Sequence, residues 1–226
     1  TTIVVDIPFD DLQRDYDAIA ITAGAMNAIE LDVPGSDLDG VQYGVDFMKR
    51  ANLGDPLAVG SDVVVIGGGY TAMDCSRTSL RHGAERVSIV YRRTRSELVV
   101  DDEELGETEH EGVRMEFLAS PIEILGEDGR VTGVKFVRNS LGSPDASGRR
   151  SPVPIEGSEF VIPAQTVIPA VSQATDLSFL WVESTFEVSH GRVKVDPATY
   201  ATNVRGVFAC GDFVTGPTTL IEAAGH

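Results

Sequence analysis

The sequence lacks a long apolar run, has few basic residues for its number of acidic ones, and has only two cysteines, which are not close in sequence. Each of these shortages excludes a class of protein. No apolar stretch approaches the ~20 residues that a membrane-spanning helix requires. Acidic residues outnumber basic ones by 35 to 18, so the formal net charge is −17 and the surface repels nucleic acids and anionic membranes. Cys75 and Cys210 lie far apart in the sequence, which excludes a disulfide framework, a zinc site and a redox Cys-x-x-Cys motif.

The composition otherwise indicates a globular protein of one large or two small domains. The chain has 226 residues, and 42% of them are hydrophobic. Because the sequence has no signal peptide and no paired cysteines, we expect a cytoplasmic protein, with neither nucleic acid nor a membrane as its partner. The sequence does not begin with methionine and ends inside an apolar helical pattern, so we expect it to be part of a longer protein.

The stretch from residue 62 to residue 93 carries the clearest pattern. Residues 63–66 form a short β-branched run, which is typical of a strand buried on both faces. Three glycines follow, then residues 70–80 predict a helix that ends before Gly83, and residues 87–91 predict a second strand. Strand, glycine turn, helix and strand in this order indicate the dinucleotide-binding unit.

Each position of the glycine turn has a physical reason in such a unit. In the pattern Gly67-x-Gly69-x-x-Ala72, Gly67 permits the tight turn, Gly69 lets a pyrophosphate approach the backbone, and Ala72 lets the helix pack close to the strand. The amides at the start of the helix then face the phosphates. The predicted phosphate-binding residues are Gly67, Gly68, Gly69, Tyr70, Thr71 and Ala72. The alternative is a tight turn of purely structural importance, with no ligand.

Two arginines directly after the second strand decide between the two common dinucleotides. NAD sites usually place Asp or Glu there, about 20 residues beyond the glycines, to bind the ribose 2′-hydroxyl. This sequence places Arg92 and Arg93 at that point, and guanidinium groups bind a 2′-phosphate that a carboxylate would repel. We therefore expect NADP(H) in preference to NAD(H). The alternative is that both arginines only form a solvated strand end.

A second candidate ligand site lies near the end of the sequence. Residues 207–210 predict an apolar strand that leads into Gly211 and Asp212, and ligands of open α/β sheets bind at the carboxyl ends of strands. The Asp212 carboxylate would suit a sugar or ribitol hydroxyl. Pro217 starts a helix predicted at residues 217–224, whose first amides would point at the same ligand.

The remaining segments predict shorter elements. Residues 101–111 indicate an acidic helix with a solvated face, and the alternative of a metal site has no supporting ligand spacing. Residues 122–125 and 131–137 indicate a hairpin, and the Ser-, Gly- and Pro-rich residues 139–157 indicate a surface loop. The other expected elements are strands at residues 3–5, 16–22, 113–118, 160–162 and 165–170, a short helix at 42–51, a linker at 52–60 and an irregular stretch at 181–195.

The motifs together resemble those of flavoprotein oxidoreductases with two dinucleotide-binding domains, and among these the small (β) subunit of NADPH-dependent glutamate synthase. The Tyr-Arg-Arg sequence at the end of the second strand and the Gly-Asp pair near the end of the chain are the most specific parts of the resemblance. The matching stretches cover nearly the whole chain and include residues 20–24, 33–35, 65–75, 90–97, 168–173 and 206–212.

That resemblance implies an α/β fold in which a Rossmann-like NAD(P)-binding domain, a parallel sheet with a β-hairpin meander, is inserted into an FAD-binding domain. The NADP(H)-binding domain would span residues 53–162, and the partial FAD-binding domain residues 1–52 and 163–226. The glycine motif for FAD and the cluster-binding cysteines of that family have no counterpart in this sequence. The cofactor-binding residues that the resemblance adds are Ala170, Gly211, Asp212, Thr218, Thr219 and Leu220, with the amides of the last three facing the flavin.

The implied activity is reduction of FAD by NADPH, with electrons passing on to iron–sulfur centres. The cofactors carry that chemistry, so we predict no catalytic acid, base or nucleophile. The implied partners are an iron–sulfur domain and a larger amidotransferase-type or electron-accepting subunit. Two other functions stay open: a non-catalytic nucleotide-binding or assembly module, and a disulfide reductase of the thioredoxin reductase type, which would require the missing Cys-x-x-Cys motif.

Overall fold

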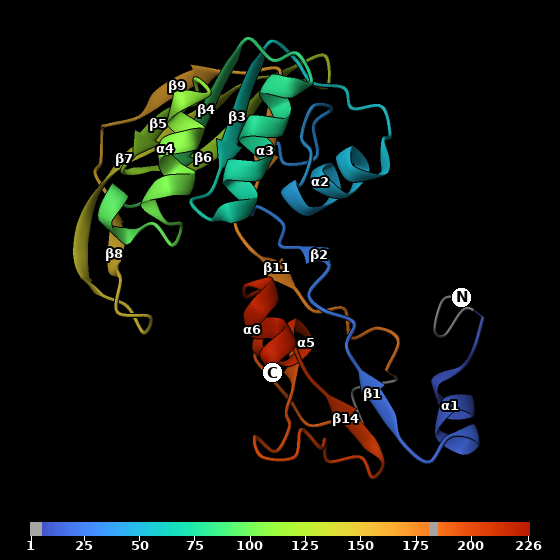
Figure 1. Cartoon of the computed structure of the whole chain (residues 1–226). Coiled ribbons are helices and arrows are strands. Elements are labelled where there is room, and N and C mark those ends of the chain that lie inside the picture. Colours follow the sequence, from blue (N-terminus) through green and yellow to red (C-terminus); the bar gives the residue numbers. More distant parts are fainter. Residues whose placement is uncertain (1–5, 181–184) are drawn as a thin grey trace. The chain divides into compact units, whose positions relative to one another are not determined.

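The structure, a computed structural model, describes residues 6–180 and 185–226, which form two compact units (Figure 1). Unit 1 consists of residues 1–29 and 172–226, and unit 2 consists of residues 30–171. Unit 2 is therefore continuous in sequence and is inserted between the two segments of unit 1.

A four-stranded parallel sheet forms the centre of unit 2. Its order is β10–β3–β4–β5, with β3 at Asp62–Ile66, β4 at Arg86–Tyr91, β5 at Arg114–Phe117 and β10 at Thr166–Pro169. The two inner strands are mostly buried runs of Val and Ile, as the apolar pattern predicts. The two strands expected on either side of the glycine turn are therefore confirmed.

Helices cover one face of this sheet. α3 (Tyr70–Arg81) joins β3 to β4 as predicted, α2 (Gly44–Leu53) packs against α3, and α4 (Asp102–His110) follows a short 3₁₀ helix, η1 (Arg95–Glu97). Figure 1 shows α3 and α4 side by side over strands β3 to β5. The helices bury their apolar side chains against the sheet, and this packing holds the start of α3 close to the end of β3. The buried side chains of this layer include Phe47, Val63, Met73, Ile89 and Leu105.

The acidic helix α4 uses its carboxylates to bind the neighbouring helix. Arg77 of α3 donates to Glu104 at 2.8 Å and to Glu111 at 2.7 Å, and Arg81 donates to Glu111 at 2.8 Å. The hydrogen bond from Arg77 is the main reason why the pKa of Glu111 is lowered. The carboxylates that the sequence assigns to a solvated face therefore also join α4 to α3.

An antiparallel sheet covers the opposite face of the parallel sheet. Its strands are β6 (Ala119–Glu127), β7 (Arg130–Pro144), β8 (Arg150–Pro154) and β9 (Phe160–Pro163), in the order β6–β7–β8 with β9 also paired to β7. The expected hairpin and meander are therefore present. Because both faces of the parallel sheet are covered, the positions of its strand ends are fixed. The apolar side chains between the two sheets include Val64, Ile66, Val90, Ile124, Val134 and Phe136.

The prediction of a surface loop at residues 139–157 is wrong, because most of this stretch is a β-hairpin. β7 continues past Asn139 and pairs with β8, so that Asn139 lies opposite Pro154. The hairpin is held by residues distant in sequence: Nε of Arg150 donates to Oε1 of Glu97 at 2.6 Å. A composition rich in Ser, Gly and Pro indicates a loop only where no such tertiary contact forms.

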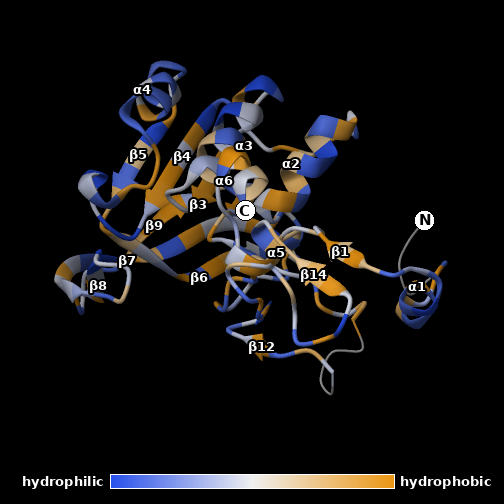
Figure 2. Ribbon diagram, turned by 60° about the horizontal axis from the view of Figure 1, so that its bottom comes forward, coloured by the Kyte–Doolittle hydropathy of each residue, from blue (hydrophilic) through white to orange (hydrophobic). Residues whose placement is uncertain are grey.

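Unit 1 consists of short elements around an apolar core of its own, which includes Phe9, Ile21, Leu180 and Phe213. The parallel strands β1 and β14 are mostly hydrophobic (Figure 2). They confirm shorter forms of the strands expected at residues 16–22 and 207–210, whereas α5 was not predicted. The elements are α1 (Phe9–Asp15), β1 (Ile19–Ile21), β2 (Asn27–Ala28), β11 (Gln173–Ala174), β12 (Val188–Ser189), β13 (Arg192–Val193), β14 (Val207–Ala209), α5 (Asp212–Thr215) and α6 (Leu220–Gly225).

Two expectations for unit 1 fall on residues that the structure does not describe. These are the strand expected at residues 3–5 and the first part, residues 181–184, of the expected irregular stretch. Across the described parts of the two units, no helix combines the length and the hydrophobicity needed to cross a bilayer.

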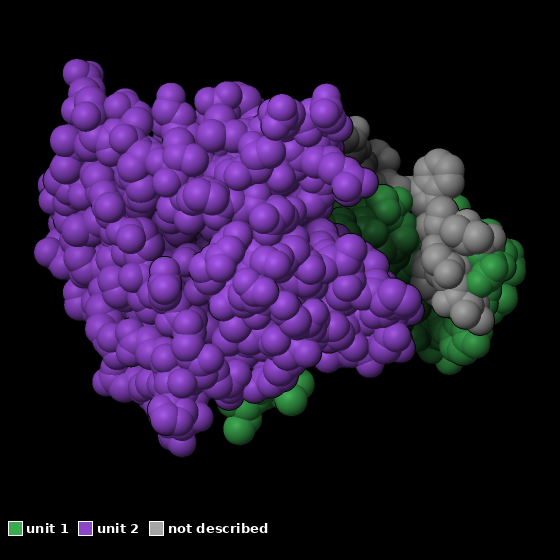
Figure 3. Space-filling model, turned by 90° about the horizontal axis from the view of Figure 1, so that it is seen from above, with its two compact units in different colours: residues 1–29, 172–226 green, residues 30–171 purple. Residues whose placement is uncertain are grey.

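The division into units differs from the expected domain bounds (Figure 3). Unit 2 extends beyond residues 53–162 in both directions. The physical reason is packing: α2 lies against α3, and β10 pairs in parallel with β3 inside the same sheet. Residues that the sequence assigns to the flanking domain therefore complete the sheet and the helix layer of the inserted one.

Candidate nucleotide-binding site

The glycine turn lies at the carboxyl end of β3, and two of its three glycines are required by the packing of the chain itself. Gly67 has a φ of +155°, and a Cβ at this position would lie 2.3 Å from the carbonyl oxygen of Ala170. A Cβ on Gly68 would lie 2.4 Å from Cδ2 of the Tyr91 ring. A purely structural turn therefore explains Gly67 and Gly68. The structure also brings Ala170, a predicted site residue, directly beside Gly67.

Gly69 differs from its two neighbours, because neither its backbone nor its surroundings require glycine. Its φ of −111° and ψ of 178° are open to any residue. A Cβ built at this position has its nearest neighbour, Cγ2 of Val99, at 3.8 Å, which is an ordinary van der Waals distance. A missing side chain here leaves space in front of α3, as a close approach of a phosphate to the backbone requires. The alternative of a structural turn does not explain Gly69.

The amino terminus of α3 has unused hydrogen-bond donors. No side chain caps this helix, and the amides of residues 68–71 find no acceptor among the described residues. By contrast, Asp101 caps α4 by accepting from the Glu104 amide at 2.8 Å, and Thr219 caps α6. Ala72 is fully buried where α3 meets the sheet, as predicted. Free amides at the positive end of a helix dipole form a suitable site for an anion such as a pyrophosphate.

Tyr70 connects this helix start to the neighbouring helix. Its hydroxyl donates to Oδ2 of Asp101 at 3.1 Å, although its side chain is largely exposed. The same hydrogen bond raises the pKa of Tyr70, while the amide of Glu104 is the main reason why the pKa of Asp101 is lowered. Asp101 therefore stays ionised at neutral pH, and the starts of α3 and α4 are held together beside the glycine turn.

The two arginines after β4 have different environments. The Arg92 side chain is exposed and has no partner among the described residues, while its carbonyl oxygen accepts from Nδ2 of Asn139 at 3.0 Å. Arg93 is only 3% exposed: its Nη2 donates to Asp145 at 2.6 Å and its Nε to the Arg150 carbonyl at 2.7 Å. This differs from the expectation that both bind a 2′-phosphate, because the Arg93 guanidinium holds the β7–β8 hairpin. Arg92 is the arginine that remains available.

We therefore expect Arg93→Leu to destabilise the protein while Arg92→Leu does not. Loss of the Arg93 guanidinium leaves the Arg150 carbonyl and Oδ2 of Asp145 without this donor, which costs about 1–3 kcal/mol in the free energy of unfolding. Arg92→Leu removes an exposed, unpartnered charge and should change it by less than about 0.5 kcal/mol. Urea titrations of both variants would check this. Equal stabilities of the two variants would contradict a structural role for Arg93.

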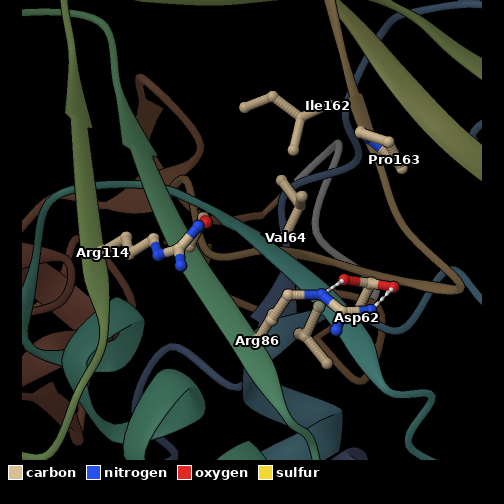
Figure 4. A pocket seen from close by; sticks show the side chains of 8 residues that line it. Asp62, Val64, Arg86, Arg114, Ile162 and Pro163 are labelled. Atoms are coloured by element: carbon tan, nitrogen blue, oxygen red, sulfur yellow. Dashed lines mark hydrogen bonds and ion pairs between the residues drawn. The ribbon is translucent and has the colours of Figure 1, made fainter.

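A hollow of about 200 Å³ lies at the amino-terminal edge of the same sheet (Figure 4). Asp62 and Arg86, which both line it, bind each other: Nη2 of Arg86 donates to Oδ2 of Asp62 at 2.7 Å. The hydrogen bond from Arg86 is the main reason why the pKa of Asp62 is lowered. Arg114 extends toward the same space. Ligands of parallel sheets bind at the opposite, carboxyl edge, where the glycine turn lies. The apolar part of the lining is Val63, Val64, Ile162 and Pro163.

The candidate site in unit 1 centres on Gly211 and Asp212. Gly211 follows β14 with a φ of +65°, and Asp212 begins α5 as a half-buried residue. Oδ1 of Asp212 accepts from the Thr218 amide at 3.1 Å and from the Thr218 hydroxyl at 2.6 Å. The structure therefore brings Asp212 and Thr218 together, but as partners of each other.

The start of α6 is also satisfied from within the chain. The Thr219 amide donates to Oε2 of Glu222 at 3.0 Å, and the Thr219 hydroxyl accepts from the Glu222 amide in a capping box. Of the three amides expected to face a flavin, those of Thr218 and Thr219 thus have internal acceptors. The Leu220 amide has none among the described residues, and the Leu220 side chain is 88% exposed.

Three residues close to the site were not foreseen. The Tyr91 ring covers Gly68, and its hydroxyl donates to the Glu97 carbonyl at 2.8 Å. Leu118 and Asn139 bind the backbone of the two arginines through contacts that join separate strands. The position of Tyr91 at the end of an apolar strand is a usable signal, but nothing in the sequence indicates the roles of Leu118 and Asn139.

The cysteines and acids that the structure describes form neither a redox centre nor a metal site. Both cysteines are free thiols, and burial raises the pKa of Cys75 to about 12, so this thiol is not a redox-active thiolate. Among residues 6–180 and 185–226, no group of three or more His, Cys, Asp or Glu side chains could hold a metal ion.

The chain has curated relatives among the subunits of NADP-linked oxidoreductases. It is 45% identical to the NADP(+)-dependent formate dehydrogenase subunit beta of Moorella thermoacetica, over 99% of this chain and 32% of that protein. It is 38% identical to the glutamate synthase [NADPH] small chain of Azospirillum brasilense, over 96% of this chain and 48% of that protein. The chain thus spans about a third to a half of the length of these relatives. The resemblance to glutamate synthase small subunits is confirmed.

The fold matches that of solved oxidoreductase structures. FprA of Mycobacterium tuberculosis, solved in complex with NADPH, superposes with a TM-score of 0.74 at 23% identity, over 95% of this chain and 62% of that chain. The expected α/β, Rossmann-like fold with parallel sheets and an antiparallel meander is therefore confirmed. The sequence profile of the pyridine nucleotide-disulphide oxidoreductases matches residues 9–226. The chain belongs to the pyridine nucleotide-disulphide oxidoreductase family.

Proposed function

We propose that this chain is the NADPH-binding portion of a flavin-dependent oxidoreductase that passes hydride from NADPH to FAD. The observation that carries the proposal is the glycine turn with its open Gly69 and free helix amides, followed at the next strand end by the free guanidinium of Arg92. The first part suits a pyrophosphate, and the second suits a 2′-phosphate. The family and the NADP-linked names of the relatives support the same assignment.

The residues of the chain bind and orient, and they carry no proton in the reaction. The amides of residues 68–71 would hold the pyrophosphate, Gly69 would admit it, and Arg92 would bind the ribose 2′-phosphate. A bound nicotinamide would supply the hydride chemistry, and a bound FAD would be its acceptor. Because that transfer needs no protein acid or base, the lack of a catalytic dyad at the glycine turn is consistent with the proposal.

The flavin would be held by the family's FAD-binding domain, to which we assign unit 1. The residues of this chain fit that role in part: Oδ2 of Asp212 and the Leu220 amide have no partner among the described residues, whereas the amides of Thr218 and Thr219 are engaged. The remaining contacts would come from a glycine motif for FAD that this sequence does not contain. We accordingly assign to unit 1 one edge of a flavin site.

The electrons would leave the flavin through iron–sulfur centres to a larger amidotransferase-type or electron-accepting subunit. The relatives support a subunit role, because their names describe a subunit beta and a small chain. The same names differ in the compound they give beside the nucleotide, formate in one and glutamate in the other, and agree on NADP. The shared segment is therefore best assigned to NADPH, and the terminal acceptor to other parts of the assembly.

Dye reduction by the full-length protein tests the proposal. With NADPH as the donor and an artificial electron acceptor, we expect activity that saturates with NADPH, and the purified protein should show the absorbance bands of a flavin. NADPH binding without flavin absorbance or dye reduction would instead identify a non-catalytic nucleotide-binding module. If the protein neither binds NADPH nor reduces the dye, the proposal is contradicted.

A further inference from the structure

Two residues bind the backbone of Arg92 and Arg93 after β4: Asn139 of β7 and Leu118, which lies between β5 and β6. Asn139 is only 3% exposed, and its Nδ2 donates to the Arg92 carbonyl at 3.0 Å and to Oγ of Ser120 at 2.9 Å. The Leu118 amide donates to the Arg93 carbonyl at 3.1 Å, and the Leu118 carbonyl accepts from the Asn139 amide at 2.7 Å. Both carbonyls are thus bound by a connected pair of residues.

Both residues of this pair have an energetically unfavourable feature: a strained backbone at Leu118 and an unpaired buried acceptor at Asn139. Leu118 has a φ of +56°, in the left-handed region that a branched, bulky residue rarely adopts. Oδ1 of Asn139 is buried and has no hydrogen-bond partner among the described residues. A buried acceptor without a donor is unfavourable, and a leucine could fill a similar volume without this penalty. What the asparagine adds is a pair of hydrogen bonds, one to the Arg92 carbonyl and one to Oγ of Ser120.

The orientation of the Asn139 amide follows from the chemistry of its partner. The Arg92 carbonyl can only accept a hydrogen bond, so the amide nitrogen, and not the oxygen, must face it. The contact joins the end of the parallel sheet to β7 over 47 positions of sequence. It lies immediately behind the residue whose side chain is the free guanidinium of the site.

Arg92 depends on this contact more than a buried arginine would. Its side chain makes no hydrogen bond or ion pair with the described residues, so nothing within the chain orients the guanidinium except its backbone. Arg93, by contrast, is held through its own side chain. A change behind the Arg92 carbonyl therefore shifts the Arg92 guanidinium and leaves the glycine turn, at the end of a different strand, in place.

We propose that Asn139 is a positioning residue for dinucleotide selectivity: by binding the Arg92 carbonyl, it aims the Arg92 guanidinium at the 2′-phosphate of NADPH. The inference rests on the proposed function and adds a residue to it. Asn139 touches no part of the ligand in this account. Its loss should therefore affect the nucleotide that carries a 2′-phosphate and spare the nucleotide that lacks it.

The test measures the dissociation constants of NADPH and NADH for the full-length protein and its variants. We expect Asn139→Leu to lower the preference for NADPH about threefold to tenfold, with the NADH constant unchanged within about twofold. Ser120→Ala is the matched control, because it removes the other acceptor of the same amide and leaves Arg92 bound; it should keep the preference. If Asn139→Leu fails to fold, Asn139→Ala replaces it, because the smaller side chain cannot overpack the site. We expect the same loss of preference for NADPH from this variant.

A double-mutant cycle separates positioning from a general structural role. In an Arg92→Leu background, Asn139→Leu should have no further effect on the NADPH constant, because there is no guanidinium left to aim. An equal weakening of NADPH and NADH, an undiminished effect in the Arg92→Leu background, or an unchanged preference would each overturn the inference. If the unmodified protein prefers NADPH but Asn139 does not matter, this inference alone fails. If the unmodified protein has no preference, the proposed NADPH site fails with it.

Discussion

Gly69→Ala is expected to weaken the binding of NADPH and NADH alike by about 100-fold while leaving the stability of the protein unchanged. A methyl group at this position meets no atom of the chain closer than 3.8 Å, and the backbone φ of −111° accepts alanine. The same methyl group occupies the space through which a pyrophosphate reaches the free amides of α3. Losing two charge-assisted hydrogen bonds of about 1.5 kcal/mol each gives this factor.

The neighbouring glycines provide the matched controls for this prediction. A Cβ on Gly67 would lie 2.3 Å from a backbone oxygen, and one on Gly68 2.4 Å from an aromatic ring carbon. Gly67→Ala and Gly68→Ala should therefore lower the melting temperature, whereas Gly69→Ala should not. Normal nucleotide binding by Gly69→Ala would mean that the turn has structural importance only. A large loss of stability in Gly69→Ala would mean that the space in front of α3 is filled.

Arg92→Leu is the prediction with the second largest effect, and it concerns NADPH alone. A guanidinium bound to a 2′-phosphate contributes about 1.5–3 kcal/mol, so we expect NADPH affinity to fall about 10- to 100-fold and NADH affinity to stay the same. The protein as a whole carries a net charge of −17, which repels a phosphate and makes the local positive charge decisive. Titration calorimetry with each nucleotide measures both effects.

Arg114→Leu is the charge-matched control for Arg92→Leu. Arg114 is also exposed, begins β5 of the same sheet and lies at the edge opposite the glycine turn. Its replacement removes the same charge and should change neither affinity by more than about twofold. If Arg92→Leu kept full NADPH affinity, the 2′-phosphate would have to be bound elsewhere, for example by Arg93 after release from Asp145.

The central strand, turn, helix and strand could be predicted because their signals are local. Four apolar residues, three glycines and a helix of twelve residues follow one another without interruption, and the structure places them as expected. The three glycines could not be told apart in this way. Glycine is required at positions 67 and 68 by contacts with Ala170, directly after β10, and Tyr91, at the end of β4, whereas at position 69 a side chain would only fill open space.

The differences between the structure and the sequence-based expectations share one physical cause, which is contact between residues far apart in sequence. Arg92 and Arg93 are adjacent and chemically identical, yet Arg93 is drawn inward by Asp145, 52 positions away. Residues 139–157 read as a loop by composition, but the ion pair between Arg150 and Glu97 fixes most of them as a hairpin. Unit 2 extends beyond the domain expected at residues 53–162, and the pairing of β10 with β3 that adds to it leaves no local signal in the sequence.

The measurement that tests the account most directly is a calorimetric titration of the full-length protein with NADPH and then with NADH. We expect both nucleotides to bind and NADPH to bind at least about tenfold more tightly, because both reach the amides of α3 but only NADPH engages Arg92. Equal affinities would contradict the role of Arg92. Binding of neither nucleotide would contradict the assignment of the glycine turn as a dinucleotide site.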